Sequence, residues 1–137
     1  MSDGRSPRLG GIAVIGLACR VPGANTVERF WQNLVNGVES IRRLSPAALV
    51  AAGVARAEAT HPDYVPAKGV VAEADCFDAA LFGYTPNEAA LIDPQQRMML
   101  ECAWHAMEHG GYGAPEPGAR VAVYGGVALN TYLLRNV

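Results

Sequence analysis

Excess positive charge and long apolar runs are both missing from this sequence. The formal net charge is −2, so composition gives no support to a nucleic-acid-binding surface. No apolar run is long enough to span a bilayer, and residues 1–8 lack the apolar region of a signal peptide. Only three cysteines are present, an odd number without metal-ligand spacing, which favours free thiols. These absences predict a cytoplasmic protein that contacts neither membrane nor nucleic acid.

The overall composition is typical of a packed domain. The chain has 137 residues, of which 50% are hydrophobic and 18% are charged, so a single domain with an apolar core is expected. Residues 1–10 are rich in Gly, Ser, Pro and Arg, and we expect them to form a mobile N-terminal tail. The domain itself is then predicted to begin at residue 11.

One helix with recognisable ends is predicted over residues 94–109. Asp93 is a good N-cap, Pro94 fits the first helical position, and Gln96 is placed to complete a capping box. Gly110 is placed to adopt the left-handed C-cap conformation, with His109 in the last turn. The helix carries a broad apolar stripe made of Met99, Leu100, Ala103, Trp104 and Met107.

Two short apolar runs predict buried strands. Ile12–Ile15 and Val121–Tyr124 are each followed by glycine, as expected for central strands covered on both faces. The first run leads into an amphipathic helix that Asn25 and Glu28 are placed to cap and that Gly37 ends. The apolar face of that helix consists of Val27, Phe30, Trp31, Leu34 and Val35. This order predicts an α/β layered domain.

The middle of the chain gives weaker signals. Ser45 and Pro46 predict the start of a short helix that ends near Ala52, after which residues 53–66 read as a loop. Residues 68–74 could include a strand at Val70 and Val71, and residues 75–83 place three aromatic or aliphatic side chains at helical spacing. Thr85 and Glu88 predict a capping box for another short helix. Leu129–Leu134 is apolar and is predicted to begin a further element.

Together these segments resemble the opening of a β-ketoacyl synthase (ketosynthase) domain of a modular polyketide synthase. The first signature is Ile12–Gly23 followed by Phe30 and Trp31. The later signatures, in the family's order and spacing, are Phe77–Gly83, Asp93–Arg97 running into Leu100, Glu101 and Trp104, Val123–Gly126, and Asn130–Leu133. The similarity covers about residue 11 to the end. The ending and the alanine-rich segment after Ser45 resemble trans-acyltransferase or mixed polyketide–peptide systems.

The resemblance implies a partial thiolase-like fold, in which mixed β-sheets lie between helix layers. It also implies homodimers that work with acyl carrier proteins and other synthase domains. The complete domain would catalyse decarboxylative Claisen condensation of phosphopantetheine-bound acyl chains with a malonyl-type extender. In the family, however, the cysteine nucleophile lies in a Gly-Pro-Ser…Thr-Ala-Cys-Ser-Ser segment, and two histidines follow it. All three would fall after Val137, so residues 11–137 are predicted to be an N-terminal part without catalytic, cofactor-binding or metal-binding residues.

The cysteines and histidines of this chain are weak substitutes. Cys19 lies in a loop without a nucleophile-elbow frame, Cys76 lies between aspartates that disfavour a thiolate, and Cys102 reads as a buried helix thiol. His61 precedes a proline in a loop. His105 and His109 have a metal-ligand spacing, but they lack the intervening Glu of a zinc hydrolase and any evident third ligand.

The polar residues of the Asp93–Arg97 motif also have structural explanations. Asp93 and Gln96 can cap the helix, and Arg97 can anchor surrounding loops or pair with Glu101 one turn later. Three hypotheses therefore stay open. The first is a ketosynthase fragment that is inactive alone. The second is a naturally truncated, non-catalytic ketosynthase acting as a structural or interaction module. The third, weaker, is a metal or redox protein using His105, His109 and Cys102.

Overall fold

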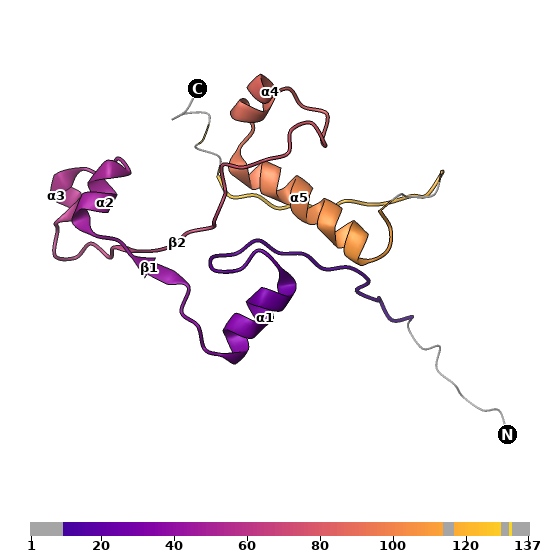
Figure 1. The fold of residues 1–137 in the computed structure, drawn as a ribbon, viewed down its shortest axis with the longest axis horizontal. Coiled ribbons are helices and arrows are strands. Elements are labelled where there is room, and N and C mark those ends of the chain that lie inside the picture. The colour runs from indigo at the N-terminus through magenta and orange to yellow at the C-terminus, as the bar shows by residue number, and fades with distance from the viewer. Residues whose placement is uncertain (1–9, 114–116, 130–131, 133–137) are drawn as a thin grey trace.

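The computed structural model of the chain describes residues 10–113, 117–129 and 132 (Figure 1). The predicted tail lies outside the described residues except for Gly10, which is exposed. Helices and strands group into three parts: α1, then a β1–β2 ribbon with α2 and α3, then α4 and α5. Their bounds are α1 Val27–Val35, β1 Ile41–Arg43, α2 Pro46–Ala51, α3 Arg56–Ala59, β2 Ala67–Gly69, α4 Pro86–Leu91 and α5 Pro94–His109.

Helix α5 spans the predicted residues, but its caps differ in detail. The Asp93 carboxylate accepts from the Gln95 N–H at 2.7 Å. Gln96 donates its backbone N–H to the Asp93 carbonyl at 2.9 Å, but its side chain makes no hydrogen bond to the Asp93 N–H among the described residues. The predicted capping box is therefore wrong. Gly110 is helical (φ −77°), because its N–H still bonds the Ala106 carbonyl, and the left-handed residue is Gly111 (φ 78°). The helix ends at His109 as predicted, and the left-handed residue lies one position later than predicted.

Helix α1 forms as predicted, but its N-cap is Thr26. The Thr26 hydroxyl accepts from the Arg29 N–H at 3.2 Å, so the proposed capping pair of Asn25 and Glu28 is wrong. Gly37 ends the helix with a left-handed φ of 61°, as expected. The apolar face of α1 is largely uncovered, with Trp31 62% exposed. Its one buried residue is Asn33, whose side-chain amide donates to the Gly23 carbonyl.

The middle of the chain folds into a small unit of its own. Strands β1 and β2 pair antiparallel, with Ile41 opposite Gly69, and the short helices α2 and α3 lie at the far end of this ribbon (Figure 1). Ser45 caps α2 as predicted. Two predictions here are wrong: the expected loop over residues 53–66 contains α3, and the strand lies at Ala67–Gly69 rather than at Val70 and Val71.

The two apolar runs predicted as central strands do not form strands in the described chain. Ile12–Ile15 and Val121–Tyr124 are irregular and exposed, with Ile12 98% and Tyr124 95% accessible. A central strand needs hydrogen-bonding neighbours and helix cover, and among the described residues the only sheet is the β1–β2 pair. In the part of the chain that the structure describes, the few buried apolar residues are small or isolated: Ala24, Leu49, Ala59 and Ala89. The predicted continuation at Leu129–Leu134 lies mostly outside the described residues, and Leu129 is exposed.

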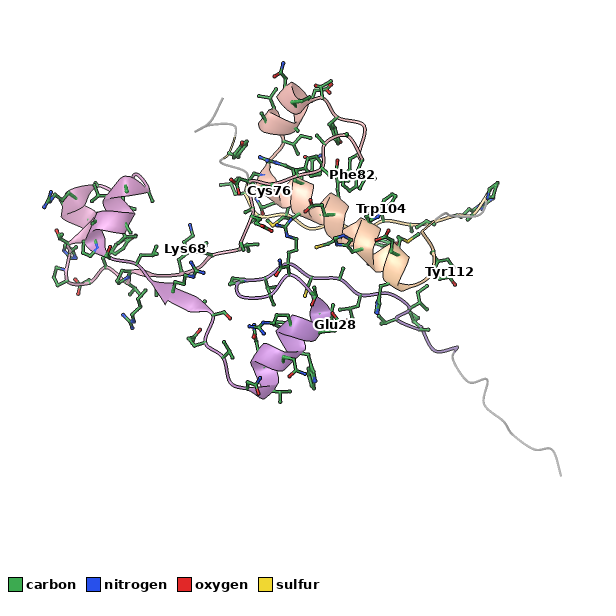
Figure 2. All side chains as sticks on the ribbon, in the orientation of Figure 1. Glu28, Lys68, Cys76, Phe82, Trp104 and Tyr112 are labelled. Atoms are coloured by element: carbon green, nitrogen blue, oxygen red, sulfur yellow. The ribbon has the colours of Figure 1, made fainter. Side chains whose placement is uncertain are left out.

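Aromatic side chains of residues 75–83 pack against α5 at Trp104. Residues 75–83 form turns rather than a helix, and they stack Phe77 on Phe82 with ring centroids 5.2 Å apart. Phe82 in turn meets Trp104 of α5 edge-on at 6.3 Å (Figure 2). Such pairs add roughly 0.5–1.5 kcal/mol beyond the area they bury. This contact holds the turn segment and α5 together.

The capping box of α4 is formed as predicted, and it makes a pH-dependent contribution. Hydrogen bonds from the Thr85 backbone N–H and hydroxyl to the Glu88 carboxylate hold its pKa below the usual value. A lowered folded-state pKa stabilises the helix start above the unfolded-state pKa, and the benefit is lost as pH falls through the folded value. An NMR titration should show Glu88 protonating at lower pH than the same residue in a Thr85→Ala variant; equal titration midpoints would contradict the cap.

Candidate functional site

The most recognisable residues of the sequence meet around the N-terminal half of α5, where Arg97 is the central group. Its side chain is only 7% exposed, and it donates hydrogen bonds to the Ile92 carbonyl at 2.9 Å and the Asp75 carbonyl at 3.3 Å. It also donates to the Tyr132 hydroxyl at 3.2 Å, which itself donates to the Ala90 carbonyl. Arg97 therefore binds three separate segments, as predicted for a loop anchor, rather than a ligand.

The rest of the Asp93–Arg97 motif has the same kind of role. Asp93 is buried and caps the helix, while the Gln95 side-chain carbonyl accepts from the Ala128 N–H at 3.1 Å. Gln95 thereby holds the segment after the second apolar run against α5. Sequence reasoning missed Gln95, because an exposed-looking glutamine in a first helical turn gives no signal of a distant partner.

Glu101 pairs with Arg20 and not with Arg97. The Arg20 guanidinium binds the Glu101 carboxylate and also donates to the Ala72 and Glu73 carbonyls, the latter at 2.9 Å. Both charged side chains are largely covered. The predicted pair of Arg97 with Glu101 is wrong, because the Arg97 guanidinium donates to the Ile92 and Asp75 carbonyls and to the Tyr132 hydroxyl instead. Arg20, which sequence reasoning did not single out, is a second loop anchor.

Residues 16–20 run along α5 in the opposite direction to the helix. A Cβ on Gly16 would lie 2.0 Å from the Ala106 carbonyl oxygen, so only glycine fits this close approach. The next residue, Leu17, donates its N–H to Nδ1 of His109 at 3.1 Å. His109 is therefore a hydrogen-bond acceptor for the backbone. Its Nδ1 lone pair is occupied and is not free to bind a metal ion.

The other side chains considered as metal ligands or catalytic groups do not lie together in one site. Within the described ranges, no group of three or more His, Cys, Asp or Glu side chains could hold a metal ion. His61 is exposed and lies beside Asp63 in its turn. A hollow of about 300 Å³ between α1 and α5 is lined by residues that include Cys19, His105 and His109. The predicted absence of cofactors and metals stays a prediction.

All three cysteines are free thiols. Burial raises the pKa of the Cys102 thiol, against the opposing effect of the nearby Arg20 guanidinium, while Cys76 is exposed (Figure 2). None of them combines exposure with a positive environment that would make it a strong nucleophile. The arrangement around α5 therefore positions chain segments, and the predicted absence of catalytic residues stays a prediction.

Iodoacetamide should alkylate the three thiols at different rates. We expect Cys76 to react first and Cys102 last, because burial disfavours the Cys102 thiolate that attacks the reagent. Peptide mass mapping over time gives the order. Alkylation of Cys102 as fast as Cys76 would contradict the described packing, and the order should disappear in denaturant.

An open apolar surface lies along α5 where the aromatic turn of residues 75–83 packs on the helix. A hollow of about 270 Å³ is lined by the aromatic residues Phe82, Trp104 and Tyr112 together with Leu100, Ala103 and Met107 (Figure 2). Four of the five residues of the predicted apolar stripe, all except Met99, thus line this hollow. Its walls carry no charged side chain. This surface suits further packing better than recognition of a polar substrate.

Comparison with known sequences identifies the protein family of this chain. Residues 10–136 match the sequence profile of the β-ketoacyl synthase N-terminal domain. The chain belongs to the β-ketoacyl synthase family. The profile covers the Gly16–Arg20 segment and the whole of α5. Arg20, Gln95 and Arg97, which tie chain segments to α5, all lie within the matched range.

The relatives are polyketide synthases. The chain is 43% identical over 126 residues to a phenolphthiocerol/phthiocerol polyketide synthase subunit from Mycobacterium tuberculosis, and 40% identical over 121 residues to polyketide synthase PksN of Bacillus subtilis. These matches cover 92% and 88% of this chain. The chain spans only 8% and 2% of the length of those relatives.

Solved ketosynthases share the fold. The structure is similar to ketosynthase twelve of the bacillaene synthase from Bacillus amyloliquefaciens, with a TM-score of 0.62 and 40% identity, and to the module 1 ketosynthase of that synthase, with a TM-score of 0.57. Both matches cover 70% of this chain, but 17% and 16% of those chains. The predicted α/β class and partial ketosynthase fold are confirmed. Among the described residues, no helix is both long and apolar enough to cross a membrane.

Proposed function

We propose that this chain supplies the N-terminal, non-catalytic part of a polyketide synthase ketosynthase. The observation that carries the proposal is the use of the family's signature residues: Arg97, Gln95 and Arg20 are all engaged in holding chain segments to α5. None is left to contact a substrate. Its role is structural: α5 and the loops bound to it form one packed layer of a larger domain.

The uncovered apolar segments support the same proposal. Ile12–Ile15 and Val121–Tyr124 have strand-like sequences yet are exposed, and much of the α1 face is exposed too. Apolar strands of this kind are stable only when sheet neighbours and helices cover them. The further layers of a thiolase-like ketosynthase would provide that cover. A self-sufficient truncated module, the alternative, would be expected to have a polar exterior at these positions.

In the complete domain, the reaction would be decarboxylative Claisen condensation. An acyl chain would pass from a carrier-protein phosphopantetheine to the family's cysteine, and a malonyl-type extender would lose CO₂ and attack that thioester. The resemblance places the cysteine and two histidines in segments that these 137 residues do not contain. Acyl carrier protein, neighbouring synthase domains and a second ketosynthase copy are the proposed partners, and the cytoplasm is the proposed location.

A thioester assay tests the non-catalytic assignment. The chain is incubated with a short acyl thioester of N-acetylcysteamine, and intact mass is followed over time. We expect acylation no faster than that of an unstructured cysteine peptide. A Cys76→Ser variant serves as the control, because it removes the exposed thiol. Rapid acylation that saturates with thioester concentration and disappears in a single Cys→Ser variant would overturn the proposal.

A further inference from the structure

The segment over residues 16–20 is held along α5 by three contacts. Gly16 lies against the Ala106 carbonyl, the Leu17 N–H donates to His109, and the Arg20 guanidinium binds Glu101. Gly16 and Leu17 contact the last two turns of α5, whereas Arg20 reaches Glu101 nearer its middle. The segment therefore runs antiparallel to the helix.

This antiparallel arrangement places two of the three cysteines in the same region. Cys19 lies between Leu17 and Arg20, so it is held over the turns of α5 between His109 and Glu101. Cys102 follows Glu101 in that stretch, on the face that also carries Ala106 and His109. Both thiols are half-buried, whereas Cys76 is exposed. Burial is the main cause that raises the pKa of the Cys102 thiol, and the nearby Cys19 thiol raises it further, which is consistent with this placement.

We propose that Cys19 and Cys102 form a disulfide that ties the 16–20 segment to α5 when the protein meets a small-molecule disulfide oxidant. The Cys19 thiolate, which lines the open hollow beside α1, attacks one sulfur of the oxidant and releases a thiolate. The Cys102 thiolate then attacks the Cys19 sulfur and displaces the second thiol. Two protein thiols are oxidised, one oxidant disulfide is reduced to two thiols, and each protein proton leaves with a released thiolate.

Glutathione disulfide is a suitable probe for the full chain. After incubation, free thiols are blocked, the protein is digested without reductant, and linked peptides are identified by mass. We expect a peptide pair joining Cys19 to Cys102 and a loss of about 2 Da in the intact protein, one hydrogen from each thiol. Cys76 should carry the blocking group or a glutathione adduct. Oxidation should also raise the thermal midpoint, because the bond closes a long loop.

Two variants and one condition make the test decisive. Cys76→Ser should form the same linked peptide, whereas Cys19→Ser should give glutathione adducts without the loss of about 2 Da. In guanidinium chloride the three possible pairings should all appear, because the fold no longer selects one. Pairs that include Cys76 in the native protein, or a native pattern identical to that in denaturant, would overturn the proposal. A glutathione adduct at Cys19 without any peptide linked to Cys102 would also overturn the proposal.

Discussion

Replacing Gly16 with alanine should destabilise the chain by about 1–3 kcal/mol, the range for forcing an extra methyl into a packed site. The added Cβ would lie 2.0 Å from the Ala106 carbonyl oxygen, and that neighbour is helix backbone that cannot rotate away. The 16–20 segment would have to leave α5, and the hydrogen bond from Leu17 to His109 would be lost with it. Urea unfolding followed by far-UV circular dichroism measures the change.

Gly126→Ala is the matched control, because a Cβ at Gly126 meets no atom within 4 Å. It should unfold at the wild-type urea concentration. If Gly16→Ala shared that midpoint, the close approach of the segment to α5 would be contradicted. The Gly16→Ala variant should also shift the Leu17 amide resonance, which reports the lost contact directly.

Replacing Arg97 with methionine should have a comparable or larger effect. The substitution removes three hydrogen bonds from a charged donor, each worth roughly 1.5–3 kcal/mol, and leaves the Ile92 and Asp75 carbonyls without that partner. The mutant should lose about 3 kcal/mol or more of unfolding free energy. Arg97→Lys should recover little, because one ammonium cannot replace the planar fork that reaches three segments.

Arg42→Met provides the comparison, since Arg42 is the exposed middle residue of β1. Its unfolding midpoint should stay close to that of the wild type. Equal stability of Arg97→Met and Arg42→Met would show that the buried guanidinium does not hold the segments together. Partial proteolysis offers a second measure: cleavage near Asp75 should accelerate only in the Arg97 variants.

Local signals in the sequence predicted the helices well. The caps at Ser45 and Thr85 and the Pro94 start of α5 each depend on residues within one turn of each other. The errors at Asn25 and Gly110 are shifts of one residue, which is the usual precision of cap prediction. Structure that depends on near neighbours is therefore readable from sequence.

Contacts between distant residues could not be predicted in the same way. Arg97 was expected to anchor loops, but sequence spacing favoured Glu101 as its partner, whereas Glu101 binds Arg20, 81 residues earlier. The strand predictions for Ile12–Ile15 and Val121–Tyr124 are wrong for the described chain, because a strand forms only with neighbours that no local pattern supplies. The family resemblance came from the motif order, and the comparisons confirmed it.

A chimeric ketosynthase tests the central claim most directly. Residues 10–136 of this chain would replace the matching segment of ketosynthase twelve of the bacillaene synthase, its relative at 40% identity. If the chain supplies a structural layer, the chimera should fold and accept an acyl group from a thioester, seen by intact mass, while the Arg97→Met chimera should not. A chimera that folds as stably as the parent enzyme yet takes up no acyl group would contradict the account.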